Sequence, residues 1–301
     1  MEDKLFQIGR DMIIYNDRYR TVGKNGMLKL QNKVPFIQFP TLQKIDFVKH
    51  GFSTRLGGVS KEHCATMNLG YTRGDNPDDV TENYKRICKA MEIPMENLVF
   101  SDQIHETNIK VVSKEDTIVD FMEEFTRGEK KHIGYDGLVT NQPGVALVTS
   151  YADCVPLFFV DSVKKAIGLS HSGWRGTVKK MGAKTVEVMQ KEFGTNPEDL
   201  ICVIGPSICQ DCYEVSKDVY LSFKADFTDE QVEEILLPKE NDKYQLDLWK
   251  ANQLILREAG VPRENISVAN ICTCCNSTLL FSHRKTQGVR GSLQGFLMIT
   301  E

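Results

Sequence analysis

The chain has 301 residues, of which 41% are hydrophobic and 26% charged, with a formal net charge of -4 and a sequence pI near 5.9. Because this composition gives no basic surface, nucleic acid is not expected as a partner, and a small solute or another protein is favoured. No apolar run approaches the roughly 18 residues of a membrane span, and the segment 1–20 lacks the apolar core of a signal peptide, so we expect no membrane contact and a cytoplasmic location.

The amino-terminal part of the sequence predicts short strands and loops. Residues 1–50 alternate short apolar runs with charged residues, which indicates a few antiparallel strands. Residues 51–70 are rich in Gly, Ser and Thr and are typical of loops that join short strands. Arg55 is unusual here because this charged residue lies between an apolar segment and a double glycine.

Residues 77–91 carry the clearest helix pattern. Asn76 suits the N-cap, and Pro77 suits the first helical position. Apolar side chains then follow at helical spacing, at Val80, Tyr84, Ile87, Cys88 and Met91. The strongly charged segment 113–135 is predicted to be a helix or loop excursion with solvated charges, and we assign no chemistry to it.

Two more helices are predicted in the second half of the chain. Residues 174–193 carry apolar side chains at helical spacing and stop before Gly194, a residue type that often follows a helix. Residues 248–259 follow Asp247, a plausible N-cap, and precede Gly260. We therefore expect His171 to lie where a strand ends and a helix is about to begin.

Six apolar runs rich in β-branched and aromatic residues predict strands. The runs are LVT (138–140), GVALVTSY (144–151), VPLFFVD (155–161), KKAIGLSH (164–171), LICVIGPSI (200–208) and SLQGFLMIT (292–300). Helices and strands interleave without a regular β-α-β repeat, which favours an α+β fold with mixed sheets and packed helices. We predict a single catalytic domain over residues 1–301, in which residues 1–50 supply amino-terminal strands.

Three residues next to predicted strands form a permitted ligand set for catalytic zinc. Such a zinc ion typically has three protein ligands drawn from His, Cys and carboxylates, and a fourth position that stays open. His105 follows a strand-like run, Cys154 lies in a short link between two apolar strands, and His171 ends a strand. A lone His is more often a surface or hydrogen-bonded residue, and a lone Cys is more often a small core residue. Spacing alone does not decide between these interpretations.

The nine cysteines also permit a second metal site. In the cytosol they are expected to be reduced thiols, metal ligands or nucleophiles, because disulfides are rare there. Cys209 and Cys212 form one C-x-x-C pair, and Cys272 and Cys275 form another, so the two pairs are a candidate structural zinc site. The intervening stretch is much longer than the roughly 15–20 residues of a zinc ribbon, which favours reduced thiols near strands. Two zinc ions per chain would support the second site, and one would argue against it.

Six short motifs carry the strongest functional signal. They are SDQIH, YDGLVT, YADCVPLFF, HSGWRGT, GPSICQDCYEV and FSHRK, in this order. Together they resemble the YfiH-type purine nucleoside phosphorylases, once called the laccase-domain or polyphenol oxidase family. The resemblance runs from about Gly51 to the carboxyl end, so residues 51–301 form the part of the chain that matches the family. Two positions depart from the family pattern: Glu106 stands where Gly is usual, and Ser172 stands where Ala is commoner.

The resemblance implies a metal site of two His and one Cys, which fall on His105, Cys154 and His171. It implies an α+β fold of the YfiH-like type and a zinc cofactor, with copper as a substitute or adventitious metal. It also implies phosphorolysis of adenosine, inosine and methylthioadenosine to the free base and (methylthio)ribose 1-phosphate, with an accompanying adenosine deaminase activity. Purine nucleosides and phosphate are therefore the expected partners. The sequence does not distinguish a monomer from a homodimer.

The chemistry of these reactions suggests further residues. Phosphorolysis requires cations or oriented amides around the attacking phosphate. Arg55 and Arg175 are the candidates, because guanidinium groups match phosphate oxygens bidentately, and the alternative for each is a surface salt bridge.

A deaminase would use zinc to lower the pKa of bound water to about 7 and a carboxylate to move protons. Asp153 and Glu106 are candidates for this carboxylate, and Asp153 alternatively orients the site through hydrogen bonds. We therefore expect Arg55, Asp153 and Cys154 to be catalytic. His283, in the FSHRK motif, is a candidate for supporting the ligands.

Three other functions compete with this interpretation. Cys154 and His171 together suit the nucleophile and base of a metal-independent cysteine hydrolase. A multicopper oxidase needs several copper ions held largely by imidazole, and six histidines without a His-x-His pair are too few for it. A non-enzymatic binding protein is the remaining alternative, and it would be favoured if no free base were released from adenosine or inosine in phosphate buffer.

Overall fold

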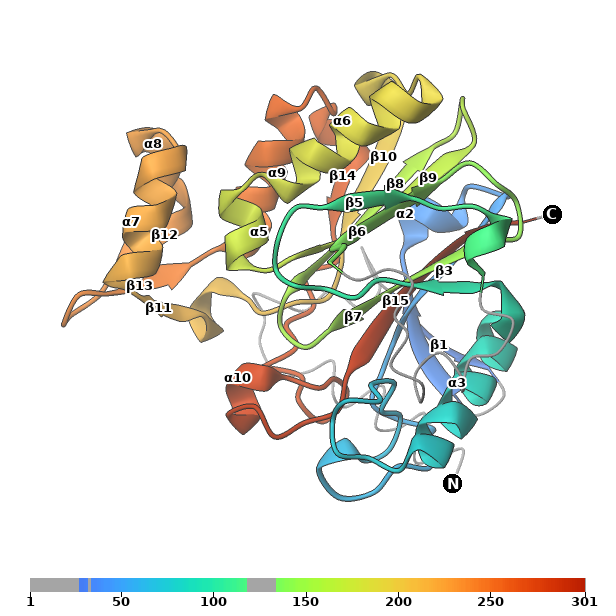
Figure 1. The fold of residues 1–301 in the computed structure, drawn as a ribbon. Helices are drawn as coiled ribbons and strands as arrows, with labels where there is room; N and C mark the ends of the chain where they lie inside the picture. Colours follow the sequence, from blue (N-terminus) through green and yellow to red (C-terminus); the bar gives the residue numbers. More distant parts are fainter. Residues whose placement is uncertain (1–26, 32–33, 118–133, 301) are drawn as a thin grey trace.

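Two six-stranded sheets pack face to face at the centre of the computed structural model, which describes residues 27–31, 34–117 and 134–300 (Figure 1). The first sheet has the order β1 (Met27–Gln31), β2 (Val34–Gln38), β3 (Val48–Ser53), β15 (Leu293–Ile299), β7 (Ala146–Tyr151) and β4 (Leu98–Phe100). The second sheet has the order β14 (Ile266–Val268), β10 (Leu200–Ile204), β8 (Val155–Asp161), β9 (Ala166–Ser172), β6 (Gly137–Thr140) and β5 (Ile109–Val111). Strands β4, β14 and β5 pair in parallel with their neighbours, and the other pairs of these two sheets are antiparallel.

Strand β8 shows why the apolar runs in the sequence are continuous. All seven of its residues are buried. Phe158 and Val160 belong to the core between the two sheets, whereas Leu157 and Phe159 belong to the core between the second sheet and its helices. A strand that is covered on both faces has no polar side to alternate with the apolar one.

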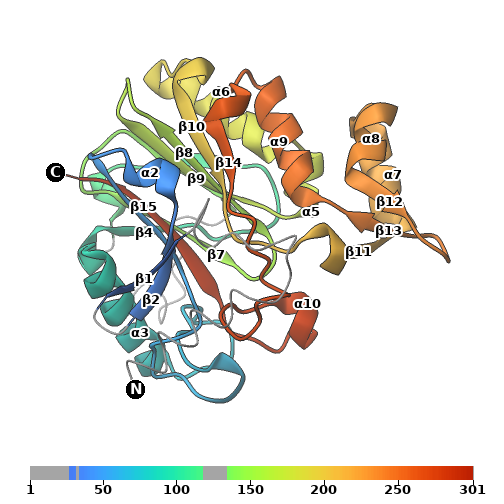
Figure 2. The same cartoon turned by 180° about the vertical axis from the view of Figure 1, so that it is seen from behind.

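Helices cover the outer faces of both sheets, which gives four layers in the order helix, sheet, sheet, helix (Figures 1 and 2). Helix α3 (Pro77–Met91) packs on the first sheet, where Tyr84 shares a core with Phe296 of β15. It begins as predicted, because the Asn76 side chain accepts a hydrogen bond of 2.9 Å from the backbone N–H of Asp78. On the second sheet lies α9 (Leu248–Glu258), whose N-cap Asp247 accepts a hydrogen bond of 2.9 Å from the N–H of Lys250.

The helix predicted over residues 174–193 is wrong in one respect, because the chain forms two helices there. Helix α5 spans Trp174–Val178 and helix α6 spans Met181–Phe193. Lys180 adopts a left-handed conformation with φ 60° between them. Val178 and Met181 are both buried on either side of this break, so the apolar spacing continues and the sequence pattern does not reveal the interruption.

A smaller unit stands apart from the two large sheets (Figures 1 and 2). It consists of the sheet β11 (Glu214–Ser216), β13 (Lys243–Leu246) and β12 (Leu236–Pro238), with the helices α7 (Lys217–Asp226) and α8 (Asp229–Ile235). The other short helices within the described residues are α2 (Pro40–Gln43), α10 (His283–Thr286), η2 (Glu62–Cys64), η3 (Met95–Asn97), η4 (Lys114–Asp116), η5 (Pro197–Asp199), η6 (Gln210–Cys212) and η7 (Arg263–Asn265).

The α+β prediction with mixed sheets is confirmed, and β1 to β3 are antiparallel strands of the predicted amino-terminal region. Most of the charged segment predicted as an excursion, residues 118–133, lies outside the described residues. Within the described ranges, no helix has the length and apolar character that crossing a membrane requires.

Candidate metal centre

Segments from both large sheets bring His105, Cys154 and His171 together. His105 follows β4, Cys154 lies in the link that crosses from β7 in the first sheet to β8 in the second, and His171 lies on β9. Pro156 of β8 pairs with His171, so the link that carries Cys154 ends beside this histidine. One ligand atom from each of the three residues lies within 4.8 Å of the other two. The predicted ligand set is thus assembled in space.

Asp136, just before β6, holds the segments of this cluster in place, and its side chain is fully buried. Its carboxylate accepts hydrogen bonds of 3.0 Å from the backbone N–H groups of Ile104, His105 and Glu106. The same carboxylate lies 2.9 Å from Nδ1 of His171, which leaves Nε2 of that ring for a metal ion. Asp136 therefore fixes both histidine segments at once.

The electrostatics of Asp136 fit this role. Burial alone would raise the pKa of its carboxyl group, but the hydrogen bond and charge of His171, together with the backbone N–H donors, hold the pKa below its usual value. Sequence reasoning assigned no role to this residue. The available signal was its place in the YDGLVT motif, directly before a predicted strand.

Cys154 and His171 stabilise each other's charged forms. Burial alone would raise the pKa of the Cys154 thiol, but the charge of His171 and hydrogen bonds from both histidines lower it to about 6. Burial alone would lower the pKa of His171, whereas the Cys154 thiolate and Asp136 raise it to about 9. The thiolate is the form of cysteine that binds metals and attacks electrophiles, so this pair suits both a metal site and a cysteine nucleophile.

Gly173 leaves room beside the three ligand side chains. A Cβ atom at this position would lie 3.0 Å from the Cys154 sulfur, 3.4 Å from Cδ2 of His105 and 3.8 Å from Cε1 of His171. The first separation is tighter than ordinary van der Waals contact. The absence of a side chain at Gly173 therefore lets the three ligands converge, and the donor set of two imidazoles and one thiolate suits zinc.

Asp153, next to Cys154, is buried and accepts hydrogen bonds from three other segments of the chain. One carboxylate oxygen accepts a hydrogen bond of 2.6 Å from the Thr273 hydroxyl, and the other accepts one of 2.6 Å from the backbone N–H of Arg284. Its carbonyl accepts a hydrogen bond of 3.0 Å from the N–H of Ile208. These bonds hold the residue in an unusual left-handed backbone conformation, with φ 85°, immediately before the Cys154 ligand.

The two departures from the family pattern have separate partners. The Glu106 carboxylate forms an ion pair with Lys179, beside the exposed His105. The Ser172 hydroxyl is buried and donates a hydrogen bond of 3.1 Å to Asn252 of α9. Glu106 thus changes the surface next to the site, whereas Ser172 changes the packing behind it.

The two predicted phosphate-binding arginines lie in different settings. Arg55 donates hydrogen bonds of 2.9 and 2.8 Å to the carbonyls of Ala65 and Ser277, and its guanidinium group lies 4.5 Å from the centre of the Phe281 ring. Arg175, on α5, is exposed and lies over the Trp174 ring at 4.3 Å. The contacts of Arg55 tie loops together, and neither residue hydrogen-bonds to the three metal-ligand candidates.

Arg73 and Arg290 form a second pair of arginines, which sequence reasoning missed, and Arg290 interacts electrostatically with Asp153 and Cys154. Arg290 is buried, and its Nη1 donates a hydrogen bond of 3.1 Å to the hydroxyl of Ser292, which also accepts one of 3.1 Å from Nε of Arg73. Burial and the charge of Arg73 lower the pKa of Arg290 to about 10, against the opposing effects of Asp153 and Cys154. Nε of Arg290 has no partner among the described residues. Both arginines lie outside the six motifs, so the motifs did not predict them.

The remaining candidates lie nearby or elsewhere. His283 is exposed at the start of α10, and partial burial and the charge of Arg290 lower its pKa against the opposing charge of Asp153. His50 is buried away from the site and accepts a hydrogen bond of 2.9 Å from the N–H of Phe39. The four cysteines of the two C-x-x-C pairs also come together, as a separate group.

The fold and the site together define the class of protein. It is an α+β protein with two stacked sheets, and a candidate metal centre of two His and one Cys lies where the chain crosses between them. The family described as multi-copper polyphenol oxidoreductase laccase matches residues 49–300, and the chain belongs to this family. Both the resemblance to the YfiH type and the fold class are thereby confirmed, because a YfiH structure also superposes on the chain.

Individual relatives support this placement. Purine nucleoside phosphorylase YlmD of Bacillus subtilis is 36% identical over 256 residues, which are 83% of this chain and 88% of that protein. Adenosine deaminase RL5, from an unknown prokaryotic organism, is 33% identical over 81% of this chain and 93% of its own length. The crystal structure of hypothetical protein YfiH from Bacillus licheniformis has a TM-score of 0.83 and 30% identity, and the match covers 91% of this chain and 99% of that one.

Proposed function

We propose that the protein is a zinc-dependent purine nucleoside phosphorylase that cleaves adenosine, inosine and methylthioadenosine with phosphate, and that it also deaminates adenosine. The observation that carries the proposal is the convergence of His105, Cys154 and His171 in a chain whose relatives are named purine nucleoside phosphorylase or adenosine deaminase. Family membership supports the general activity, and the site residues support the finer assignment.

The three side chains suit a catalytic metal better than a structural one. They supply three ligands, and His105 is exposed, which leaves a fourth position accessible from solvent. When bound there, zinc would polarise a substrate oxygen or lower the pKa of a bound water. Asp136 and Gly173 prepare the site for this ion, because one orients the histidine segments and the other keeps the space between the ligands clear.

The family description refers to several copper ions, but the residues of this chain favour a single metal centre that acts on small molecules. Among the described residues, two groups of His, Cys, Asp or Glu are close enough to hold a metal ion, and the second consists of four cysteines. A multicopper site would need many more imidazole ligands than the six histidines of this chain supply. Copper in the three-residue centre would therefore be a substitute for zinc.

Phosphate is best placed beside Arg290 and Arg73. Both guanidinium groups approach the hydroxyl of Ser292, and Nε of Arg290 is a buried donor without a partner among the described residues. A buried, unpaired donor on a cation is costly unless a ligand completes it, and phosphate oxygens match guanidinium donors well. Arg55 remains a weaker candidate because backbone carbonyls already engage its donors, and exposed Arg175 suits the rim of the site.

Two carboxylates divide the roles that deamination requires. Both oxygens of Asp153 accept hydrogen bonds within the protein, so it acts as a positioning residue for Cys154. Glu106 follows the exposed ligand His105 and is partly exposed, and its pairing with Lys179 can be released by side-chain rotation alone. Glu106 is therefore the better proton carrier for a substrate at the open metal position.

A metal-independent cysteine hydrolase is the second candidate function. The lowered pKa of Cys154, beside His171, is the observation that favours it. Irreversible alkylation of Cys154 in untreated protein, together with activity that chelators leave unchanged, would support this alternative. Loss of activity on zinc removal and its return on zinc addition would exclude it.

The decisive assay uses the full chain with zinc and identifies products by chromatography. Inosine should give hypoxanthine and ribose 1-phosphate when inorganic phosphate is present, and no hypoxanthine when phosphate is omitted. Adenosine should give adenine and, by deamination, inosine. Cys154→Ala should lose both reactions, because a metal ligand is removed. Base release that does not depend on phosphate, or full activity in Cys154→Ala, would overturn the proposal.

A further inference from the structure

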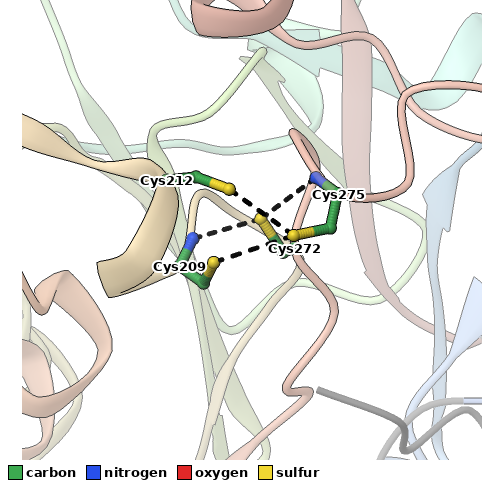
Figure 3. A group of neighbouring side chains, drawn as sticks. All are labelled: Cys209, Cys212, Cys272 and Cys275. Atoms are coloured by element: carbon green, nitrogen blue, oxygen red, sulfur yellow. Dashed lines mark hydrogen bonds between the residues drawn. The ribbon is translucent and has the colours of Figure 1, made fainter. Parts of the chain in front are cut away.

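The two C-x-x-C pairs meet at a junction between distant parts of the chain (Figure 3). Cys209 and Cys212 lie at the start and end of the turn η6, and Cys272 and Cys275 lie in a turn after β14. An isolated parallel bridge joins Ser207 to Cys272 and aligns the two segments. Backbone pairing therefore contributes to holding the two pairs side by side.

The four sulfur atoms have the spacing of a tetrahedral metal site. They all lie within 4.8 Å of one another, with 3.5 Å between Cys212 and Cys275 and 4.0 Å between Cys209 and Cys275. Zinc–thiolate bonds of about 2.3 Å place the corners of a tetrahedron about 3.8 Å apart. The sulfur positions thus bracket the separation that a single zinc ion requires.

Backbone donors point at one of these sulfurs. The N–H groups of Cys209 and Cys275 lie 3.3 and 3.4 Å from the sulfur of Cys272, which is fully buried, as is Cys209 (Figure 3). Such N–H donors stabilise a thiolate more than a neutral thiol, and they orient it toward a metal ion. Several thiolates packed this closely would repel one another strongly without a cation among them.

Other uses of the four thiols fit less well. A disulfide requires sulfurs at about 2.05 Å, and the sulfur separations of 3.5 and 4.0 Å are too long for one. An iron–sulfur cluster places several irons and sulfides between its thiolates and therefore needs a wider cage than this one. A catalytic zinc keeps an open position, whereas here all four positions come from cysteine.

We propose that Cys209, Cys212, Cys272 and Cys275 bind a structural zinc ion that is separate from the three-residue metal centre. Each zinc-binding pair is adjacent to a residue that holds Asp153. Ile208, which precedes Cys209, donates to the Asp153 carbonyl, and Thr273, which follows Cys272, donates to its carboxylate.

A third connection runs through Arg284. Its guanidinium group donates a hydrogen bond of 3.3 Å to the carbonyl of Cys212, and its backbone N–H donates to the Asp153 carboxylate. The four-cysteine zinc thus fixes the segments that position Asp153, and Asp153 in turn positions the neighbouring ligand Cys154.

Zinc analysis of the purified full chain tests the proposal without any substitution. The wild type should contain two zinc ions per chain, and Cys154→Ala should contain one. With one equivalent of cobalt in place of this remaining zinc, Cys154→Ala should show strong thiolate-to-cobalt charge-transfer absorption and the visible bands of tetrahedral cobalt. No zinc in Cys154→Ala, or iron in place of zinc, would overturn the proposal, whereas one zinc in the wild type that Cys154→Ala retains would support it and count instead against zinc at the three-residue centre.

Substitution within the cluster gives a second test. The double variant C209S/C272S removes one ligand from each pair and should retain only the zinc of the three-residue centre. Cys274→Ser is the matched control, because Cys274 lies between Cys272 and Cys275 but outside the group of four, and it should retain two zinc ions. Loss of zinc from Cys274→Ser, or two zinc ions in C209S/C272S, would contradict the assignment. If C209S/C272S does not fold, the wild-type and Cys154→Ala measurements still decide.

Discussion

The three-residue metal centre and the four-cysteine cluster differ in how accessible a bound metal ion would be to solvent and substrate. The first combines two imidazoles with one thiolate and keeps His105 exposed, whereas the second offers four thiolates, two of them fully buried. A missing fourth ligand allows substrate to reach a metal ion, and a complete set prevents it. In the proposed assignment, the first site carries out the chemistry and the second fixes loops, and the hydrogen bonds of Asp153 connect them.

We expect the largest effect from substitution of Asp136, because this residue supports the three-residue centre and not the four-cysteine cluster. Asp136→Asn replaces two acceptor oxygens by one acceptor and one donor, so the contacts to the His105 segment and to His171 cannot all form. We expect zinc at the three-residue centre to bind about 100-fold more weakly, the upper range for residues that orient metal ligands. Competition with a chromogenic chelator measures this affinity.

Asp242→Asn is the matched control, because Asp242 is exposed and pairs with Lys217 at the surface. It should bind zinc as the wild type does. Equal zinc affinity in Asp136→Asn and the wild type would show that Asp136 does not organise the ligands.

A smaller effect is expected from closing the space beside the ligands. In Gly173→Ala the new methyl group would meet the Cys154 sulfur at 3.0 Å, at a cost of about 2 kcal/mol for overpacking, or about 30-fold in zinc affinity. Gly176→Ala is the control, since its nearest contact would be an ordinary 3.6 Å. The same chelator titration applies, and an unchanged affinity in Gly173→Ala would mean that the ligands do not need this space.

Arg290 should affect phosphate and leave zinc unchanged. Arg290→Lys keeps the positive charge but removes the Nε donor and the planar fork, so we expect the KM for phosphate to rise about tenfold, the effect of losing one charged hydrogen bond. Phosphate-dependent release of base from inosine measures this constant. Arg55→Lys and Arg175→Lys serve as comparisons and should change it less. A larger rise in either of them would return the phosphate site to the arginines predicted from the sequence.

The smallest effect concerns the link between the two sites. Thr273→Val keeps the shape of the side chain but removes the hydroxyl that donates to Asp153, and it should weaken zinc at the three-residue centre about three- to tenfold. The four-cysteine zinc should stay bound, as measured by the zinc content after mild chelation. Thr278→Ala, which changes an exposed residue of the same turn region, should leave both metals unchanged. If Thr273→Val instead lost only the four-cysteine zinc, Thr273 would support that site and not the three-residue centre.

Local patterns predicted much of the fold. The cap at Asn76, Pro77 and the apolar spacing that follows are short-range features, so α3 could be predicted with its first residue. The break at Lys180 could not, because the buried side chains continue across it. The strands were visible as apolar runs, but their order in two stacked sheets depends on pairings such as β15 with β3, which join opposite ends of the chain.

The site was predictable to a similar degree. Motif resemblance selected His105, Cys154 and His171, whereas Asp136 and Arg290 act through contacts that spacing cannot show. The zinc-ribbon spacing favoured unpaired thiols for the two C-x-x-C pairs, because the smaller sheet and helices α7 to α9 are inserted between them. The bridge between Ser207 and Cys272 brings the pairs together despite this insertion.

Zinc release followed together with phosphorolysis tests the central distinction most directly. A moderate chelator added to the wild type should remove one zinc ion quickly, with complete loss of base release from inosine, and a second one only slowly. Zinc added back after the first phase should restore activity. Activity that persists after the first zinc has left, or a single phase in which metal, activity and fold disappear together, would contradict an open catalytic site beside a closed structural one.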